Sequence, residues 1–432
     1  MTPPAARPAA DAPPPRAART PRTARAGART RARVAGALGA AVLLSAAPAA
    51  AAAPVAAAAP AAPSAPTAPP AGADGIRDRQ WALRALRAEE AWGTTRGEGV
   101  TVAVLDTGVD AGHPDLEGQV LDGVDLVGMG AGPGDARWAK HGTAMAGIIA
   151  GHGHGTNRRS GVMGLAPAAR ILPVRVILEE GDPGRDKARQ TKGGALAEGI
   201  RWATDHGAHV INLSLGDDSE SAHHEAAEDE AIQYALAKGV VVVASAGNGG
   251  HRGNPVSYPA AYPGVIAVTA VDRRGRRPYF STRNWYATVS APGLDIVIAD
   301  PSRKYYESFG TSAAAAFVSG AVALVRSAHP GLSPAQVKKL LEETATYGPA
   351  AGRDDARGHG WVDPVAALQA ARSMTPAAPL PTPAGYRAQH FGPGPEPVHG
   401  REPRYVLPAA AAAGGGAVLL ALAAVLGRRR TG

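Results

Sequence analysis

The chain has 432 residues, a net charge of +8, no cysteine and many glycine (54) and proline (38) residues. Its length allows one large domain or two smaller ones, and the lack of cysteine excludes disulfides, thiolate metal sites and a cysteine nucleophile. Most of the positive charge lies in the tails, with eight arginines and one acidic residue in residues 1–53 and three arginines at 428–430. The remainder is slightly acidic, which argues against a nucleic-acid partner.

The N-terminal part of the chain has the pattern of a secretory signal. A long arginine-rich start precedes an apolar stretch, residues 34–45, and the small residues after it offer several Ala-x-Ala cleavage sites. No two of these arginines are adjacent, so the twin-arginine export route has no support. We therefore predict a signal peptide over residues 1–52, followed by an Ala/Pro-rich linker over residues 53–75 whose prolines favour extended chain.

The composition becomes that of a globular domain over residues 76–372. Apolar runs rich in valine and isoleucine alternate there with helical patterns. Near-continuous apolar strands separated by helices indicate a parallel sheet covered on both faces, which is a three-layer α/β fold. The expected strands are 100–105, 171–176, 209–215 and 240–245, and the expected helices follow His141 and cover 195–206 and 226–238.

A second membrane signal lies at the C-terminal end. Residues 373–408 are rich in proline and glycine and are predicted to form a stalk. Residues 409–427 carry no charge, and as a helix they would span about 28 Å, close to the thickness of a bilayer core. The basic tail at 428–432 favours the cytoplasmic side. These features predict a single-pass protein of the cell membrane whose globular domain is extracytoplasmic.

Three short motifs carry side chains that could take part in catalysis, but the function of each motif is ambiguous when it is considered alone. Asp-Thr-Gly at the end of a strand also marks aspartic proteases, where two carboxylates share a proton. A histidine or serine that opens an apolar helix can be purely structural. The three motifs are Asp106-Thr107-Gly108, His141-Gly142-Thr143 and Gly310-Thr311-Ser312.

Together these motifs supply the parts of a serine protease. Peptide hydrolysis by serine needs a nucleophile, a base that takes its proton, and a carboxylate that orients the base. The order Asp106, His141, Ser312 is the order found on the subtilisin fold rather than on the chymotrypsin barrel. Asn248 follows a valine-rich strand, and its amide is a candidate donor to the oxyanion. We therefore predict a catalytic triad with Asn248 as oxyanion donor.

Five segments around these residues, in this order, resemble the subtilase family over roughly residues 76–372. With the signal, the stalk and the C-terminal helix, the chain resembles the mycosin branch, the membrane proteases that accompany type VII secretion systems. The resemblance implies a serine endopeptidase acting on protein or peptide substrates beside a type VII membrane complex. The alternative is a scaffold subunit whose proteolytic activity is dispensable. The segments are VAVLDTGVD, KHGTAMAGIIAG, VINLSLG, SAGN and GTSAAAAFVSG.

The resemblance also assigns substrate contacts. Ser214, Leu215 and Gly216 match the segment that pairs with the substrate backbone, a strand-addition mode of peptide capture. The residues matching the pocket for the side chain before the scissile bond are Ala244, Ser245, Ala246 and Gly247. The chain departs from the family at Ala313, usually a bulky residue, and at Ala316, usually proline. Both departures bear on the packing around the helix that carries Ser312 rather than on the chemistry.

No cofactor or metal site is expected from the sequence. His152-Gly153-His154 is interpreted as a polar loop and the acidic stretch 217–230 as a solvated helix face. Many secreted subtilases bind calcium, but no set of residues here forms a convincing calcium-ligand pattern.

Overall fold

The computed structural model describes residues 74–219 and 222–380 of the chain. The predicted signal peptide, nearly all of the linker, most of the stalk and the predicted membrane helix at 409–427 lie outside the described residues. Those assignments therefore stay predictions.

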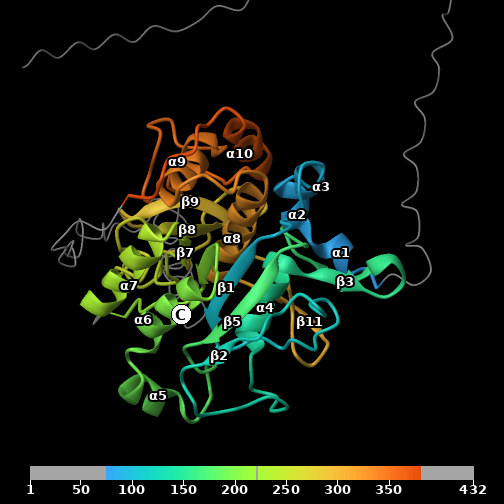
Figure 1. The fold of residues 1–432 in the computed structure, drawn as a ribbon, viewed down its shortest axis with the longest axis vertical. Coiled ribbons are helices and arrows are strands. Elements are labelled where there is room, and N and C mark those ends of the chain that lie inside the picture. The colour runs from blue at the N-terminus through green and yellow to red at the C-terminus, as the bar shows by residue number, and fades with distance from the viewer. Residues whose placement is uncertain (1–73, 220–221, 381–432) are drawn as a thin grey trace, which may run out of the picture. The chain divides into compact units, whose positions relative to one another are not determined.

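A seven-stranded sheet forms the centre of the described fold (Figure 1). Its strand order is β2-β5-β1-β6-β7-β8-β9, and every neighbouring pair is parallel. The predicted strands at 100–105, 171–176 and 240–245 correspond to β1, β5 and β7. The strands are β1 (Thr101–Asp106), β2 (Val124–Asp125), β5 (Arg170–Arg175), β6 (Val210–Leu213), β7 (Val241–Ser245), β8 (Ile266–Val271) and β9 (Ala287–Pro292).

Helices cover both faces of the sheet, so the predicted three-layer α/β fold is confirmed. Successive strand residues enter opposite cores: Val102 packs in one cluster and Ala103 in the other. The first cluster holds side chains of α4 (Lys140–Ala150), α8 (Thr311–Ala328), α9 (Pro334–Thr344) and α10 (Pro364–Ala371). The second holds side chains of α6 (Ala195–Asp205) and α7 (Ala226–Ala237), which were predicted as 195–206 and 226–238.

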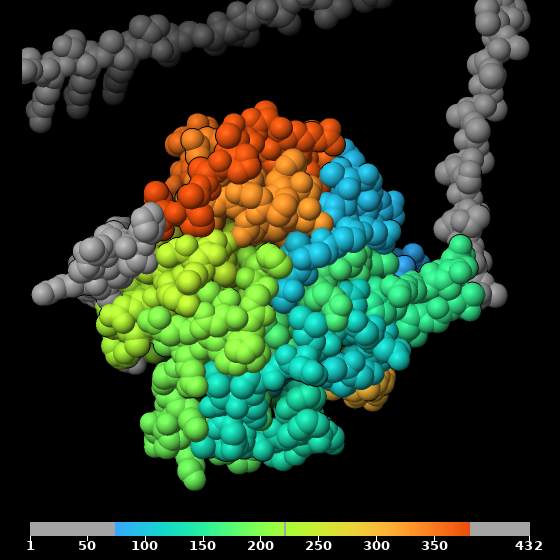
Figure 2. Space-filling view, viewed as in Figure 1, coloured from blue at the N-terminus to red at the C-terminus, as the bar shows by residue number. Residues whose placement is uncertain are grey.

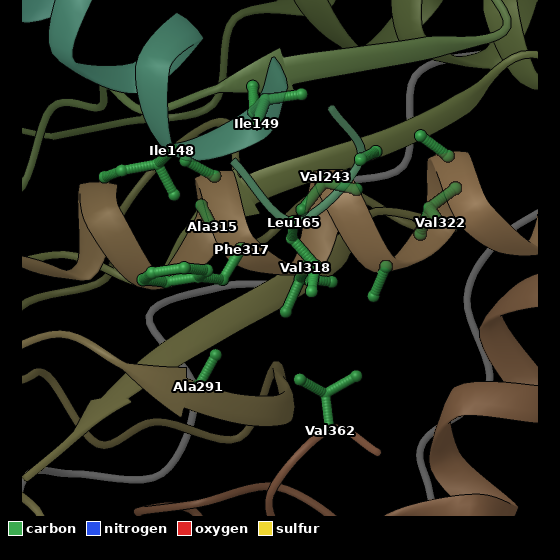
Figure 3. Close-up of a cluster of buried hydrophobic side chains, with 14 of the residues drawn as sticks. Ile148, Ile149, Leu165, Val243, Ala291, Ala315, Phe317, Val318, Val322 and Val362 are labelled. Carbon is green, nitrogen blue, oxygen red and sulfur yellow. The ribbon is translucent and has the colours of Figure 1, made fainter. Parts of the chain in front are cut away.

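Helix α8 is the central helix of the first core. In Figure 3 its side chains Phe317, Val318 and Val322 lie among residues from α4, β7 and β9. Within the described residues, α8 is the one helix that is long and apolar enough to cross a membrane, but 83% of it is buried in the fold. It is therefore a core helix. Ala313 and Ala316, where the chain departs from the family, are both buried within it.

The N-terminal segment of the described chain packs onto this core through three short helices. The side chain of Gln80 makes two hydrogen bonds to the backbone of Met163: it donates to the carbonyl (2.8 Å) and accepts from the N–H (2.9 Å). The indole of Trp81 donates to the carbonyl of Asp295, and the guanidinium of Arg87 contacts both carboxylate oxygens of Asp363. The helices are α1 (Ile76–Arg79), α2 (Trp81–Ala85) and α3 (Ala88–Trp92).

The remaining elements are small and lie at the margins. The hairpin of β3 (His152–His154) and β4 (Ser160–Met163), with the 3₁₀ turn η1 (Thr156–Arg158), projects from the edge of the molecule in Figure 2. A second hairpin joins β10 (Ile296–Ala299) and β11 (Tyr305–Ser308), and α5 (Arg185–Thr191) precedes α6.

Candidate active site

The predicted site residues gather at one edge of the sheet. Asp106 is the last residue of β1, Ser245 is the last of β7, and β6 between them ends at Leu213. The carboxyl ends of parallel strands meet at one edge, and open α/β sheets bind ligands there. Helices α4 and α8, which pack against each other, begin with Lys140-His141 and Thr311-Ser312.

His141 and Asp106 are in direct contact. The imidazole Nδ1 lies 2.8 Å and 2.9 Å from the two carboxylate oxygens of Asp106. Asp106 is fully buried, whereas the His141 side chain is 36% exposed. Since the carboxylate only accepts, it fixes the proton on Nδ1 and leaves Nε2 free to take a proton.

Two threonines and a glycine hold this pair in place. The Thr107 hydroxyl accepts from the Gly142 N–H (3.1 Å), and the Thr143 hydroxyl accepts from the Asp110 N–H (2.9 Å). The strand-end turn and the first turn of α4 are thereby locked together. A Cβ atom on residue 142 would clash with the Gly108 carbonyl, so only glycine lets the helix approach this closely.

The surroundings of His141 stabilise its protonated form. Burial lowers its pKa, but the charge of Asp106, its hydrogen bond and the charge of Glu179 outweigh this effect, so the pKa is raised above the ordinary histidine value. Glu179 also accepts from the His141 N–H at 2.8 Å. A site of this kind stabilises the imidazolium that forms when a nucleophile gives up its proton.

Ser312 lies at the same edge of the sheet, but its hydroxyl bonds to Ser214 rather than to His141. Its hydroxyl donates to the Ser214 carbonyl (3.0 Å), and the Ser214 hydroxyl donates to the Ser312 carbonyl (2.9 Å). Among the hydrogen bonds of the described residues, none joins Ser312 to His141. The hydroxyl must therefore leave Ser214 before it can give its proton to the imidazole; such bonds often tighten only when substrate is present.

Asn248, the predicted oxyanion donor, lies beside the start of α8. The side-chain oxygen of Asn248 accepts from the Thr311 N–H (2.9 Å) and hydroxyl (3.1 Å). A Cβ atom on residue 310 would lie 3.7 Å from the Ser312 nitrogen and 3.8 Å from Asn248 Nδ2. Gly310 thus lies beside two N–H donors, those of Ser312 and Asn248 Nδ2, at the N-terminus of an 18-residue helix.

Replacing Asn248 with alanine is expected to lower kcat by about 10²- to 10³-fold with little change in KM, since one oxyanion donor is lost. Steady-state kinetics on a peptide substrate measure both constants. A change in KM alone would mean that Asn248 contacts the ground-state substrate instead.

The proposed substrate segment lies just beyond β6. A strand was predicted over 209–215, but β6 ends at Leu213, so that boundary was wrong. The chain turns there because Ser214 bonds to Ser312 and Asp217 pairs with Tyr258. Gly216 is exposed and Leu215 is half-buried, which leaves this segment accessible to another extended chain.

The residues assigned to the substrate pocket lie beside that segment. The Ser245 hydroxyl donates to the Leu215 carbonyl at 3.3 Å. Gly247 has φ +103°, and a Cβ there would lie 3.0 Å from the Thr282 hydroxyl. Ala244 is fully buried in the core on the α6–α7 side, and Ala246 is also buried. The structure thus places Ser245 and Gly247 beside this segment, and both Ala244 and Ala246 within the core.

One contact at the site was not predicted. Glu179 contacts His141 across 38 residues of sequence, and no local pattern marks it. The predicted motifs already contain three of the supporting residues, Thr107, Thr143 and Gly310. A hydroxyl or a glycine close to the reactive side chain is the sequence signal that marks them.

The histidines of the candidate metal-binding stretch 152–154 have other contacts. His154 contacts the buried carboxylate of Asp115 (2.6 Å), and the His152 ring contacts two backbone carbonyls. Both histidines lie in β3, so the interpretation as a loop was wrong. Over residues 74–219 and 222–380, no three His, Asp or Glu side chains group in a way that could hold a metal ion.

Comparison with known proteins gives one consistent family. A profile described as the subtilase family matches residues 97–360. Thermitase from Thermoactinomyces vulgaris is 38% identical over 267 residues, which cover 62% of this chain and 88% of thermitase. Fervidolysin from Fervidobacterium pennivorans is 38% identical over 338 residues, covering 72% of this chain. The chain spans only 45% of the length of fervidolysin.

Solved protease structures are similar to this chain as well. MycP1 from Mycobacterium smegmatis is similar with a TM-score of 0.58 and 32% identity, over 72% of this chain and 88% of MycP1. A structure described as a serine protease MycP1, an essential component of the type VII (ESX-1) secretion system, is similar with a TM-score of 0.57 and 33% identity, over 68% of this chain and 89% of that one.

Proposed function

The chain belongs to the subtilase family, and we propose that it is a serine endopeptidase that cleaves peptide bonds through an acyl-enzyme. The contact of the His141 imidazole with the buried Asp106 carboxylate carries this proposal, because it prepares a base at the edge where Ser312 opens α8. His154 also contacts a buried carboxylate, that of Asp115, but it lies in β3 and not at the edge where Ser312 opens α8.

In the proposed reaction, Ser312 Oγ attacks the scissile carbonyl carbon while His141 Nε2 takes its proton. The carbonyl electrons move to oxygen, which the Asn248 amide and the Ser312 N–H stabilise. His141 then gives the proton to the leaving nitrogen, and the C–N bond breaks. Water activated by the same imidazole hydrolyses the ester. Asp106 stabilises the imidazolium in both halves of the reaction.

The direct test of this proposal is hydrolysis of a quenched-fluorescent peptide library by the purified protein. Hydrolysis that a serine-directed sulfonyl fluoride abolishes and a metal chelator leaves intact is the expected result. Cleavage that resists the sulfonyl fluoride, or no cleavage of any library member, would contradict the proposal.

The wider setting is part of the same proposal: a membrane-anchored protease that acts beside a type VII secretion system. Its support is the likeness to MycP1 and the predicted membrane helix at 409–427. The alternative is a scaffold subunit whose active site is dispensable. Comparing N-termini in the secreted proteins of wild-type and Ser312→Ala strains separates the two, since only a working protease creates termini that the variant lacks.

The proposed topology predicts opposite accessibility for two introduced cysteines. A cysteine placed after Arg430 should resist a membrane-impermeant thiol reagent in intact cells, because that tail is expected in the cytoplasm. A cysteine at Pro393, in the predicted stalk, should react. The native chain has no cysteine, so unmodified protein gives no background. Labelling of the C-terminal cysteine in intact cells would overturn the single-span topology.

An exposed aromatic side chain, Phe309, precedes Ser312 by three residues, and the exposed Tyr279 neighbours the ring on which Phe309 packs. Phe309 is 60% exposed and Tyr279 is 66% exposed, and Phe309 packs on the buried Phe280 with ring centroids 5.0 Å apart. The Gly250 N–H donates to the Phe280 carbonyl (2.7 Å), which ties these rings to the loop that follows Asn248. Because Phe309 lies next to the start of α8 and its partner ring is tied to the loop after Asn248, we propose that it contacts the substrate residues that follow the scissile bond.

Replacing Phe309 with serine is therefore expected to lower the selectivity for apolar leaving groups. The measurement is partitioning of an acyl-enzyme, formed from a peptide ester, between water and added phenylalanine amide or glycine amide. The preference for phenylalanine amide should fall by about tenfold, because burial of an apolar side chain is lost, while ester hydrolysis stays unchanged. An unaltered preference would remove Phe309 from the substrate-binding surface.

A further inference from the structure

Asp218, two residues after the proposed substrate segment 214–216, connects that part of the chain to the proposed oxyanion donor. One of its carboxylate oxygens accepts from the Asn248 backbone N–H (3.0 Å), and the other accepts from the Arg252 guanidinium (2.9 Å). The Asp218 side chain is 24% exposed. Both of these partners lie 30 or more residues further along the chain, on the loop that follows β7.

Asn248 and the residue after it are held by three residues, Thr311, Thr282 and Asp218. Its side-chain oxygen is held by Thr311, at the start of α8, and the next N–H, that of Gly249, donates to the Thr282 hydroxyl (3.0 Å). Asp218 supplies the third contact. These contacts fix the backbone and one end of the amide, and so aim the Nδ2 donor.

The segment that carries Asp218 is itself anchored at both ends. At one end, Ser214 and Ser312 exchange hydroxyl-to-carbonyl hydrogen bonds. At the other, the Asp217 N–H donates to the Tyr258 carbonyl at 2.9 Å. Residues 214–218 therefore touch the proposed nucleophile through Ser214 and the oxyanion donor through Asp218.

We infer that Asp218 is a positioning residue that aligns Asn248 with the oxyanion, and that Arg252 balances its charge. The inference rests on the proposed function. A donor displaced by a fraction of an ångström stabilises a transition state less well. An unpaired carboxylate next to the oxyanion pocket would oppose the developing negative charge, so the ion pair with Arg252 is part of the arrangement.

The test compares variants of the full-length protein by steady-state kinetics on one peptide substrate. Asp218→Ala should lower kcat by about tenfold or more with KM within about twofold, since the loss falls on the transition state. Asp218→Asn keeps an oxygen acceptor for the Asn248 N–H and should restore kcat to within about threefold of wild type. Thermal melting of each variant measures any effect on folding.

The decisive comparison is the double variant with Asn248→Ala. If Asp218 acts through Asn248, adding Asp218→Ala to Asn248→Ala should cost less than about twofold more. Full additivity of the two losses would overturn the inference, because it would place the action of Asp218 elsewhere. A wild-type protein without any hydrolysis would instead refute the proposed function on which the inference rests.

Arg252 gives an independent check that does not depend on Asp218→Ala folding. Arg252→Gln leaves the carboxylate charge unbalanced and should lower kcat several-fold. Combining it with Asp218→Asn removes that charge and should reverse the loss. If Arg252→Gln leaves kcat unchanged, or if Asp218→Asn does not reverse its effect, the proposed charge balance is wrong.

Discussion

Replacing Ser312 with alanine is expected to lower kcat by about 10⁶-fold, the scale found when a subtilisin loses its nucleophile. The fold should be kept, because the hydroxyl makes one hydrogen bond to the Ser214 carbonyl and its removal costs about 1 kcal/mol of stability. Kinetics on a quenched peptide and a thermal melt of the purified variant measure the two effects separately.

Ser319 provides the matched control. It lies in the same helix, is fully buried, and its hydroxyl donates to the Asn212 side chain at 2.9 Å. Ser319→Ala removes the same atom from α8, so it should lower stability but not the chemical step. Wild-type hydrolysis by Ser312→Ala, or an equal loss in both variants, would contradict the assignment of Ser312 as nucleophile.

Replacing Asp106 with asparagine is expected to lower kcat by about 10⁴-fold, because an amide no longer holds the imidazole in the tautomer that leaves Nε2 free. The pH profile should change as well. In the wild type, His141 must be neutral to act as a base, and its pKa is raised, so kcat/KM should increase with pH through a midpoint above the ordinary histidine value. Removing the Asp106 charge should lower that midpoint.

Asp110→Asn is the control for this variant, because Asp110 lies on the same turn but faces Arg303 rather than His141. It should leave both kcat and the pH midpoint close to those of the wild type. A loss of less than about tenfold in Asp106→Asn, or an unchanged midpoint, would show that Asp106 does not act through the imidazole.

Much of the fold follows from local sequence patterns. Continuous valine-rich runs marked β1 and β7, and the expected helices at 195–206 and 226–238 differ from α6 and α7 by a single residue at one end. Strand β8 has a comparable apolar run, IAVTAV, which was not among the predicted strands. Strand β9, ATVSAP, lacks such a run, because small residues fill it where the sheet packs against α8.

The candidate site was only partly predictable, because motifs report neighbours in sequence rather than in space. The Asp, His and Ser motifs each combine a reactive side chain with a glycine that permits close approach, as Gly142 does. Asp218 carries no such signal: it lies in an acidic stretch that was interpreted as a solvated helix face, but it precedes α7 and bonds to Asn248. That contact spans 30 residues, so only the folded chain reveals it.

The central claim is that His141 and Asp106 activate Ser312, and covalent labelling tests it most directly. The full-length protein is treated with a fluorophosphonate at neutral pH, digested, and mapped by mass spectrometry. One phosphonyl group on the peptide containing Ser312, lost in His141→Ala, is the predicted result. An adduct on another serine, or labelling of Ser312 that persists undiminished in His141→Ala, would contradict the account.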